Sequence, residues 1–124
     1  MARDLIRRMQ SLFFPLLRYS GGWRPATDVY RTGTGWLVKF DLAGVRPEDV
    51  CLEAAGHVLT VSGERRDDTL DEGACHYLME IAYAPFERSV ELPCNLDRCR
   101  IATAFRAGLL HVTIEPECRD EQPR

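Results

Sequence analysis

The stretch that decides the fold runs from residue 101 to residue 114 and reads IATAFRAGLLHVTI. On each side of a turn at Arg106-Ala107-Gly108, most of the large apolar residues fall on one side of a two-residue alternation. Successive side chains of a strand point to opposite faces, so this period indicates a strand with one buried face. Gly108 can adopt the positive φ that a tight turn often needs. The stretch therefore predicts a β-hairpin with these residues on one face: Ile101, Thr103, Phe105, Leu110, Val112 and Ile114.

Further strand signals precede this hairpin at residues 27–30, 36–42, 50–54, 58–62 and 86–92. In residues 36–42, one face carries Trp36, Val38, Phe40 and Leu42. The polar, acidic stretch 65–73 reads as an exposed loop, and residues 75–81 could be extended. Repeated strands at short spacing, with no convincing helix after Pro25, are typical of an immunoglobulin-like antiparallel β-sandwich. We therefore expect an all-β domain.

The composition fits one soluble globular domain. The chain has 124 residues, of which 45% are hydrophobic and 28% charged, and its formal net charge is -3. This charge argues against nucleic acid as the main partner, because phosphate binding needs concentrated Lys and Arg. No apolar run approaches the roughly 20 residues of a membrane span, and no long secretory core is visible. The sequence predicts a cytoplasmic protein with no membrane span.

The five cysteines are odd in number and include no CxxC pair: Cys51, Cys75, Cys94, Cys99 and Cys118. Cys94 and Cys99 are too far apart for the usual zinc knuckle, and no second pair completes a site. A cytosolic chain keeps such thiols reduced. We therefore expect structural or incidental thiols and no metal or other cofactor, while an intermolecular disulfide under oxidation stays open.

Residues 1–24 form an apolar arm that differs from the rest of the chain. Apolar residues recur at steps of three and four, which is the spacing of one helix face, and Pro15 would bend or end that helix. The Gly21-Gly22 pair resembles a hinge. We expect the arm to pack on its own domain, on another subunit or on a foreign chain, the alternative being a core helix of the same domain.

From about Pro25 to Glu115, the order of motifs resembles the α-crystallin domain of small heat-shock proteins. Ala26-Thr27-Asp28-Val29-Tyr30 resembles the opening strand of that family, and Leu42-Ala43-Gly44-Val45 its L-P-G-V. The stretch from Leu59 to Arg65 is close to L-x-I-x-G-E-R. The remaining matches are Phe86-Glu87-Arg88 to F-x-R, Leu92-Pro93 to L-P and Gly108-Leu109-Leu110 to G-V-L. The resemblance implies an α-crystallin domain at residues 25–116, after an arm at 1–24 and before a short tail at 117–124.

The sequence departs from the family pattern at several positions. Ala43 replaces the Pro of L-P-G, Ala84 the Gly of Y-G-x-F, and Thr103 and Ala107 the usual Ala and Asn of the closing motif. None of these changes breaks a strand. The tail at 117–124 also lacks the I-x-I motif that docks in a neighbour's groove, so large regular shells are not expected.

The resemblance to the bacterial and plant type implies a strand-exchanged homodimer. In that type, a strand within the long loop pairs with the first strand of a partner subunit, which satisfies the backbone groups of both edges. The residues placed at this interface are Asp28, Val29, Tyr30, Cys75, His76, Tyr77, Leu78 and Arg88. The alternatives are a simple surface loop and, for Arg88, a surface charge.

The same resemblance implies an ATP-independent holdase that binds partly unfolded proteins and prevents their aggregation. We assign client binding to the arm residues Leu12, Phe13, Phe14, Leu16 and Leu17. A second candidate is a groove with Val50 and Leu52 on one side and Ile101, Thr103 and Phe105 on the other. No catalytic set, Walker loop or dinucleotide turn is visible, so we do not expect an enzyme. The alternative is a sandwich-type interaction module, similar to a co-chaperone, that binds one specific folded partner.

Overall fold

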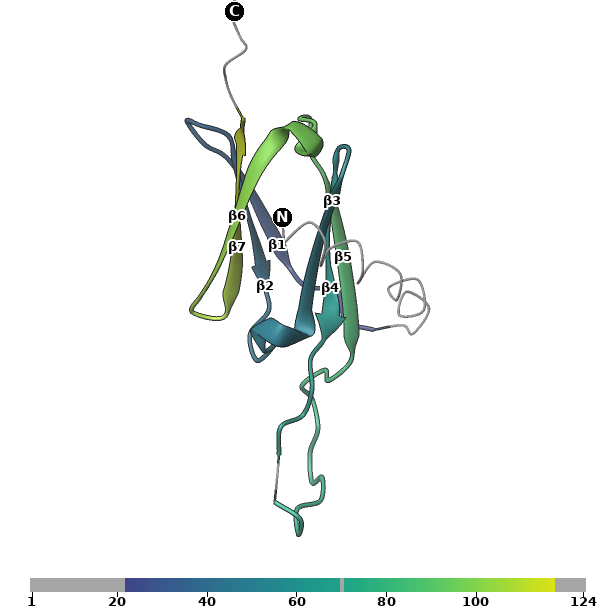
Figure 1. Ribbon diagram of the computed structural model, residues 1–124. Coiled ribbons are helices and arrows are strands. Elements are labelled where there is room, and N and C mark those ends of the chain that lie inside the picture. The colour runs from purple at the N-terminus through teal and green to yellow at the C-terminus, as the bar shows by residue number, and fades with distance from the viewer. Residues whose placement is uncertain (1–21, 70, 118–124) are drawn as a thin grey trace, which may run out of the picture.

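The computed structural model describes residues 22–69 and 71–117, and these form an antiparallel β-sandwich. One sheet has the order β1-β2-β7-β6 and the other the order β3-β4-β5 (Figure 1). The strands are β1 (Thr27–Arg31), β2 (Trp36–Asp41), β3 (Val50–Ala55), β4 (Val58–Glu64), β5 (Pro85–Glu91), β6 (Cys99–Arg106) and β7 (Leu109–Pro116). Two 3₁₀ turns, η1 (Pro47–Asp49) and η2 (Leu96–Arg98), precede β3 and β6. The prediction of an all-β antiparallel sandwich is confirmed.

The core lies between the two sheets, where the inward residues of the central strands meet. Val38 and Phe40 of β2 face Leu59 and Val61 of β4, and all four are fully buried. Each such side chain contributes about 1.5–3 kcal/mol to folding by leaving water. The alternation seen in the sequence at residues 36–42 therefore reflects one face of β2 that is buried in the core.

The β6–β7 hairpin has the register that the sequence pattern predicts. Ile101 lies opposite Ile114, and Phe105 lies opposite Leu110. The turn between them holds two successive residues in the left-handed region, Ala107 at φ 52° and Gly108 at φ 79°. Two positive φ values in a two-residue loop are the signature of a type I′ turn, which matches the twist of the strands. The sequence predicted the positive φ of Gly108 but not that of Ala107.

Gly63 marks a close approach between two strands of the smaller sheet. A Cβ atom at this position would overlap the carbonyl oxygen of Asp49, which lies just before β3. Only glycine therefore fits here without moving the backbone. Gly63 is the glycine in the stretch Leu59–Arg65, which resembles the motif L-x-I-x-G-E-R.

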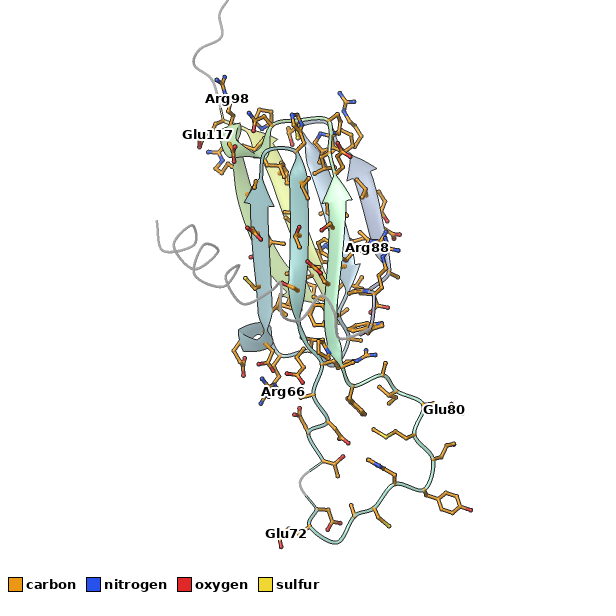
Figure 2. The ribbon with its side chains drawn as sticks, turned by 90° about the vertical axis from the view of Figure 1, so that its right-hand side faces the viewer. Arg66, Glu72, Glu80, Arg88, Arg98 and Glu117 are labelled. Atoms are coloured by element: carbon orange, nitrogen blue, oxygen red, sulfur yellow. The ribbon has the colours of Figure 1, made fainter. Side chains whose placement is uncertain are left out.

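The connection between β4 and β5, residues 65–84, extends away from both sheets (Figure 1). Glu72 and Glu80 on this connection lie far from the sandwich (Figure 2). Its described residues contain no strand, although the sequence indicated that residues 75–81 could be extended. A strand is defined by a ladder of hydrogen bonds, and this segment pairs with no other strand among residues 22–69 and 71–117.

The crossovers between the sheets decide which strand edges lie together. The Leu96 N–H donates to the Gly56 carbonyl at the β3–β4 turn over 2.7 Å, so β6 begins beside β3. The Arg88 guanidinium of β5 donates to the carbonyl of Pro25, which precedes β1, over 3.0 Å. One side of the sandwich therefore carries the edges β3 and β6, and the other carries the edges β5 and β1. Within the described residues, no helix is long and apolar enough to cross a membrane.

Candidate self-association and client-binding surfaces

The long connection presents apolar side chains to solvent. Tyr77 is fully exposed and Leu78 is 75% exposed, and Met79 and Ile81 are also largely exposed. Cys75 and His76 lie on the same exposed segment, so the structure places these four predicted interface residues together: Cys75, His76, Tyr77 and Leu78. Exposing adjacent large apolar groups is unfavourable in water, which is why such patches mark surfaces that bind other chains. The sequence reasoning left Met79 and Ile81 out of the interface, although they continue the same apolar run.

The root of this connection is fixed, although its tip is exposed. The Arg65 N–H donates to the Ala84 carbonyl over 3.0 Å, and the Arg65 Nε donates to the Ala82 carbonyl over 2.9 Å. Nearer the tip, hydrogen bonds from Thr69 lower the pKa of Asp67. The His76 Nε2 lies 3.9 Å from an Asp67 carboxylate oxygen. These contacts tie the two ends of the connection to each other where it leaves the sandwich.

Strand β1 forms one of the two edges of the larger sheet within the described part of the chain. It pairs with β2 on one side, and Asp28, Val29 and Tyr30 are exposed. Lys39 of β2 places its Nζ 4.8 Å from the centre of the Tyr30 ring. An edge strand presents unpaired N–H and C=O groups, which is a template for pairing with another chain. Within one chain, the structure does not bring β1 and residues 75–78 into a common sheet.

Arg88 faces the interior of the sandwich beside the start of β1. It lies opposite Val61 in the β4–β5 register, and its Nη1 donates to the Pro25 carbonyl over 3.0 Å. Its Nε is buried and has no hydrogen-bond partner among the described residues. Nor do those residues supply Arg88 with a carboxylate within ion-pair distance. A buried guanidinium N–H without an acceptor is unfavourable, so a hydrogen-bond acceptor placed beside the Arg88 Nε would be stabilising.

The residues predicted to line a groove lie on the edge strands β3 and β6. Ile101 is buried in the core, and Val50, Leu52 and Phe105 are partly buried against it. Thr103 is exposed, although the register places it opposite Val112 on the inward face of β6. An inward residue that remains exposed shows that the core is uncovered at this point between the two edges. The structure thus places the five residues on the two strands at one side of the sandwich, and their role as a groove stays a prediction.

Trp23 anchors the chain where it enters the sandwich, and the sequence reasoning missed it. Its N–H donates to the Pro85 carbonyl over 2.9 Å and it forms a parallel bridge with Phe86. The Trp23 and Phe86 rings meet edge to face at 5.4 Å between centroids. The predicted client-binding residues lie outside the described residues: Leu12, Phe13, Phe14, Leu16 and Leu17. In the described part of the chain, no three His, Cys, Asp or Glu side chains gather as metal ligands.

Known proteins with similar sequences include small heat shock proteins and an 18 kDa antigen. Small heat shock protein C2 of Rickettsia felis is 30% identical over 90 residues, which are 73% of this chain and 58% of that protein. The 18 kDa antigen 2 of Mycobacterium avium is 34% identical over 125 residues, covering 98% of this chain and 83% of the antigen. The chain thus spans little more than half the length of the Rickettsia protein.

Solved structures of the same kind share the fold. Heat shock protein 16.0 from Schizosaccharomyces pombe is 29% identical, with a TM-score of 0.65 over 82% of this chain and 97% of that one. HspA from Xanthomonas axonopodis is 25% identical, with a TM-score of 0.63 over 77% of this chain and 96% of that one. Small heat-shock proteins are ATP-independent chaperones and not enzymes. The family described as Hsp20/alpha crystallin matches residues 28–124, which are most of the chain. The sandwich, the motif order and these similarities agree, and the chain belongs to the Hsp20/alpha crystallin family.

Proposed function

We propose that this protein is a holdase, a chaperone that binds partly unfolded proteins without ATP and keeps them from aggregating. Family membership supports a chaperone role in general. The observation that carries the finer proposal is the set of apolar side chains exposed on the connection 65–84 and on β1. A chain that leaves such side chains in water has surface available for self-association and for unfolded polypeptides.

The assembled unit in this proposal is a strand-exchanged dimer. Residues 75–78 of one protomer add to the free edge of β1 in its partner, and the reciprocal exchange makes the contact two-fold symmetric. The exchange would bury Tyr77 and Leu78 together with Val29 and Tyr30, which are exposed in the single chain. It would also supply backbone partners that the outer edge of β1 and residues 75–78 do not find in the described part of one chain.

Arg88 contributes to the same interface in this proposal. Its side chain lies beside the residues that lead into β1, and its Nε has no acceptor among the described residues. A carbonyl or carboxylate from the exchanged segment of the partner would satisfy this N–H. Hydrogen bonds to charged groups are worth about 1.5–3 kcal/mol, so this contact would favour the dimer over the monomer.

Clients bind at two places in this proposal. The arm offers five apolar side chains close together in the sequence: Leu12, Phe13, Phe14, Leu16 and Leu17. The groove offers the partly buried apolar groups of β3 and β6 beside exposed Thr103. Unfolded segments carry extended backbone and apolar side chains, which can pair with a free strand edge and cover such groups. We place this activity in the cytoplasm, and the net charge of -3 favours protein over nucleic acid as the partner.

The experiment that tests the proposal measures light scattering from a heat-unfolding test protein without nucleotide. We expect the chain to suppress scattering at near-stoichiometric amounts. Replacing all five arm residues by Ser should abolish most of the suppression while circular dichroism still shows the β fold. Val58→Ser removes an apolar side chain that is 40% exposed outside both surfaces and is the matched control.

Two outcomes would overturn parts of this proposal. Unchanged suppression by the arm variant would show that the arm does not bind clients. The variant Thr103→Arg, which places a charge in the groove, then tests the second surface. A folded, unaltered chain that suppresses no scattering would contradict the holdase itself. The specific interaction module would then account better for the exposed surfaces.

A further inference from the structure

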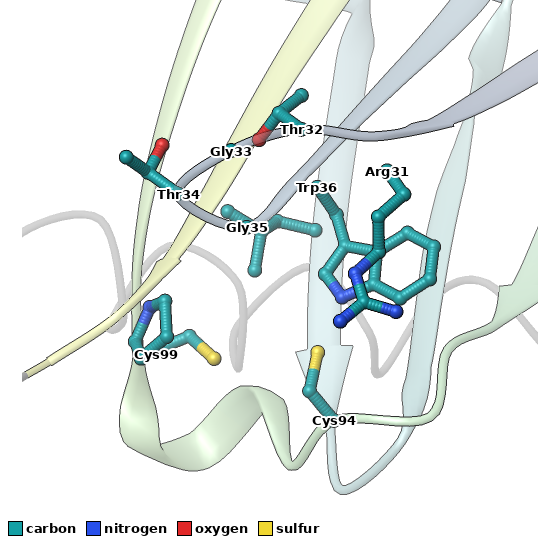
Figure 3. Close-up of a pocket in the computed structure, with 10 residues that line it drawn as sticks. Arg31, Thr32, Gly33, Thr34, Gly35, Trp36, Cys94 and Cys99 are labelled. Carbon is teal, nitrogen blue, oxygen red and sulfur yellow. The ribbon is translucent and has the colours of Figure 1, made fainter.

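A pocket of about 280 Å³ at one end of the sandwich carries two cysteines in its wall. The turn between β1 and β2 forms one side of the pocket, and the connection that contains η2 forms the other (Figure 3). Cys94 lies just before this connection turns into η2, and Cys99 is the first residue of β6. Ile114 and Pro116 of β7 also line the pocket. The two thiols therefore lie at the two ends of one short, folded connection.

The two thiols interact with each other. The Cys99 Sγ donates to the Asn95 carbonyl over 3.3 Å, and the Cys94 and Cys99 side chains line the same pocket (Figure 3). Burial raises the pKa of Cys99 to about 11, and the charge and the hydrogen bond of Cys94 contribute to this rise. Glu117 adds negative charge on the β7 side, whereas Arg31 is the cation that lines the pocket. The Cys99 thiol therefore keeps its proton to a higher pH than an ordinary thiol does.

We propose that Cys94 and Cys99 form a site at which a peroxide converts two neighbouring thiols into an intrachain disulfide. The Cys94 thiolate attacks one peroxide oxygen; an S–O bond forms, the O–O bond breaks, and the leaving hydroxide takes up a proton to become water. The Cys99 sulfur then attacks the Cys94 sulfur. The S–S bond forms as the S–O bond breaks, and the released hydroxide leaves as water with the Cys99 proton. Two thiols and one hydrogen peroxide thus give one disulfide and two waters.

The position of the pair gives the disulfide a structural consequence. The connection between Cys94 and Cys99 carries the chain from β5 in one sheet to β6 in the other. Its present ties are hydrogen bonds, from the Leu96 N–H to the Gly56 carbonyl and from the Glu117 N–H to the Arg98 carbonyl. A covalent link across its ends would fix the start of β6, which is one edge of the predicted groove. The proposed disulfide site does not rest on the proposed holdase activity, so the failure of one proposal would leave the other unaffected.

Peptide mapping of the full chain tests this proposal directly. Cleavage after Arg and Lys places each cysteine in a separate peptide, with Cys94 in residues 89–98 and Cys99 in residues 99–100. The reduced protein is treated with hydrogen peroxide, blocked with iodoacetamide and digested without reductant. We expect these two peptides to be joined, with both cysteines losing reactivity toward iodoacetamide together and a mass loss of about 2 Da per chain.

Variants and pH separate this site from the other thiols. Cys75→Ser should still form the link, whereas Cys94→Ser and Cys99→Ser should abolish it. Because the attacking group is a thiolate, the link should form faster as the pH rises. Peptides that stay separately alkylated, or a link from Cys94 to any other cysteine or to a second chain, would overturn the proposal. The mapping of the unaltered chain decides this even if a serine variant fails to fold.

Discussion

The guanidinium of Arg65 lies over the indole of Trp23, with its carbon 3.7 Å from the ring centroid. The same side chain donates from Nε to the Ala82 carbonyl over 2.9 Å and from Nη1 to the Ala43 carbonyl over 3.0 Å. One arginine thus connects the entry of the chain, the β2–β3 connection and the far end of the 65–84 connection. Its planar fork suits this role because it can stack on a ring and donate two directed hydrogen bonds at once.

We expect Arg65→Ala to lower the free energy of unfolding by about 2 kcal/mol, because a cation–π contact and two charged hydrogen bonds are lost. Thermal unfolding followed by circular dichroism measures this loss. Arg66→Ala is the matched control, since the Arg66 side chain is about half exposed and its ion pairs with Asp49 and Glu64 involve no ring stacking; a surface ion pair is worth about 0–1 kcal/mol. Equal losses in the two variants would show that the stack on Trp23 adds nothing.

Ala107 occupies a left-handed conformation that suits glycine or asparagine better. We expect Ala107→Gly and Ala107→Asn each to stabilise the domain by about 1 kcal/mol, or roughly 4–8 °C in the unfolding temperature of a domain of this size. The reverse change at the next position, Gly108→Ala, should destabilise it because Gly108 also has a positive φ. No gain from either change at Ala107 would contradict the type I′ assignment of the turn.

His111 should make stability depend on pH. Burial, followed by the charges of Arg106 and Lys39, lowers the pKa of His111 below its ordinary value of 6.5. The unfolded chain then binds this proton at a higher pH than the folded one, so its contribution is present above about pH 6.5 and is lost as the pH falls toward the folded-state pKa. When the pH is lowered from about 7.5 to about 5.5, the unfolding temperature should therefore fall less for His111→Gln than for the unaltered chain. An equal or larger loss in the variant would contradict the lowered pKa.

Arg88 should matter more for the dimer than for the single sandwich. We expect Arg88→Met to weaken dimerisation at least tenfold, because truncating one member of a buried charged hydrogen bond typically costs about 2–5 kcal/mol. Size-exclusion chromatography with mass detection over a dilution series measures the dissociation. The control is Arg100→Met, since Arg100 is largely exposed and pairs with Glu115 at 3.8 Å. Dissociation that is equal for both variants would leave Arg88 with a role inside one chain only.

Much of the sandwich could be predicted because its strands and turns leave patterns within short stretches of the sequence. Alternation in residues 36–42 and 101–114 identifies strands and their inward faces, and the turn glycine marks the hairpin. The alternation of apolar and polar residues does not tell whether the second face of a strand is also covered by other parts of the protein. Thr60 and Ser62 point away from Leu59 and Val61, and yet they are buried as well. The contacts that cover a face come from segments distant in sequence, and no local pattern records them.

The candidate surfaces were predictable by type and less so in detail. Apolar residues at 77–81 mark a segment that gains from burial, whether or not it forms a strand within its own chain. The stack of Arg65 on Trp23 and the meeting of Cys94 with Cys99 in one pocket depend on how turns and crossovers fold in three dimensions. Sequence spacing alone excluded a zinc knuckle at Cys94 and Cys99, but it could not show that the connection folds back to bring the two thiols together.

The most direct test of the account measures amide hydrogen exchange in β1, Thr27–Arg31. In a strand-exchanged dimer the outer edge of β1 is paired with residues 75–78 of the partner, so its amides should exchange slowly. A chain with residues 75–78 replaced by alternating Gly and Ser should lose this protection, while the amides of β7 in the sheet interior keep theirs. We expect slow exchange at β1 in the unaltered chain and fast exchange in the variant. Equal exchange at β1 in the two chains would contradict strand exchange.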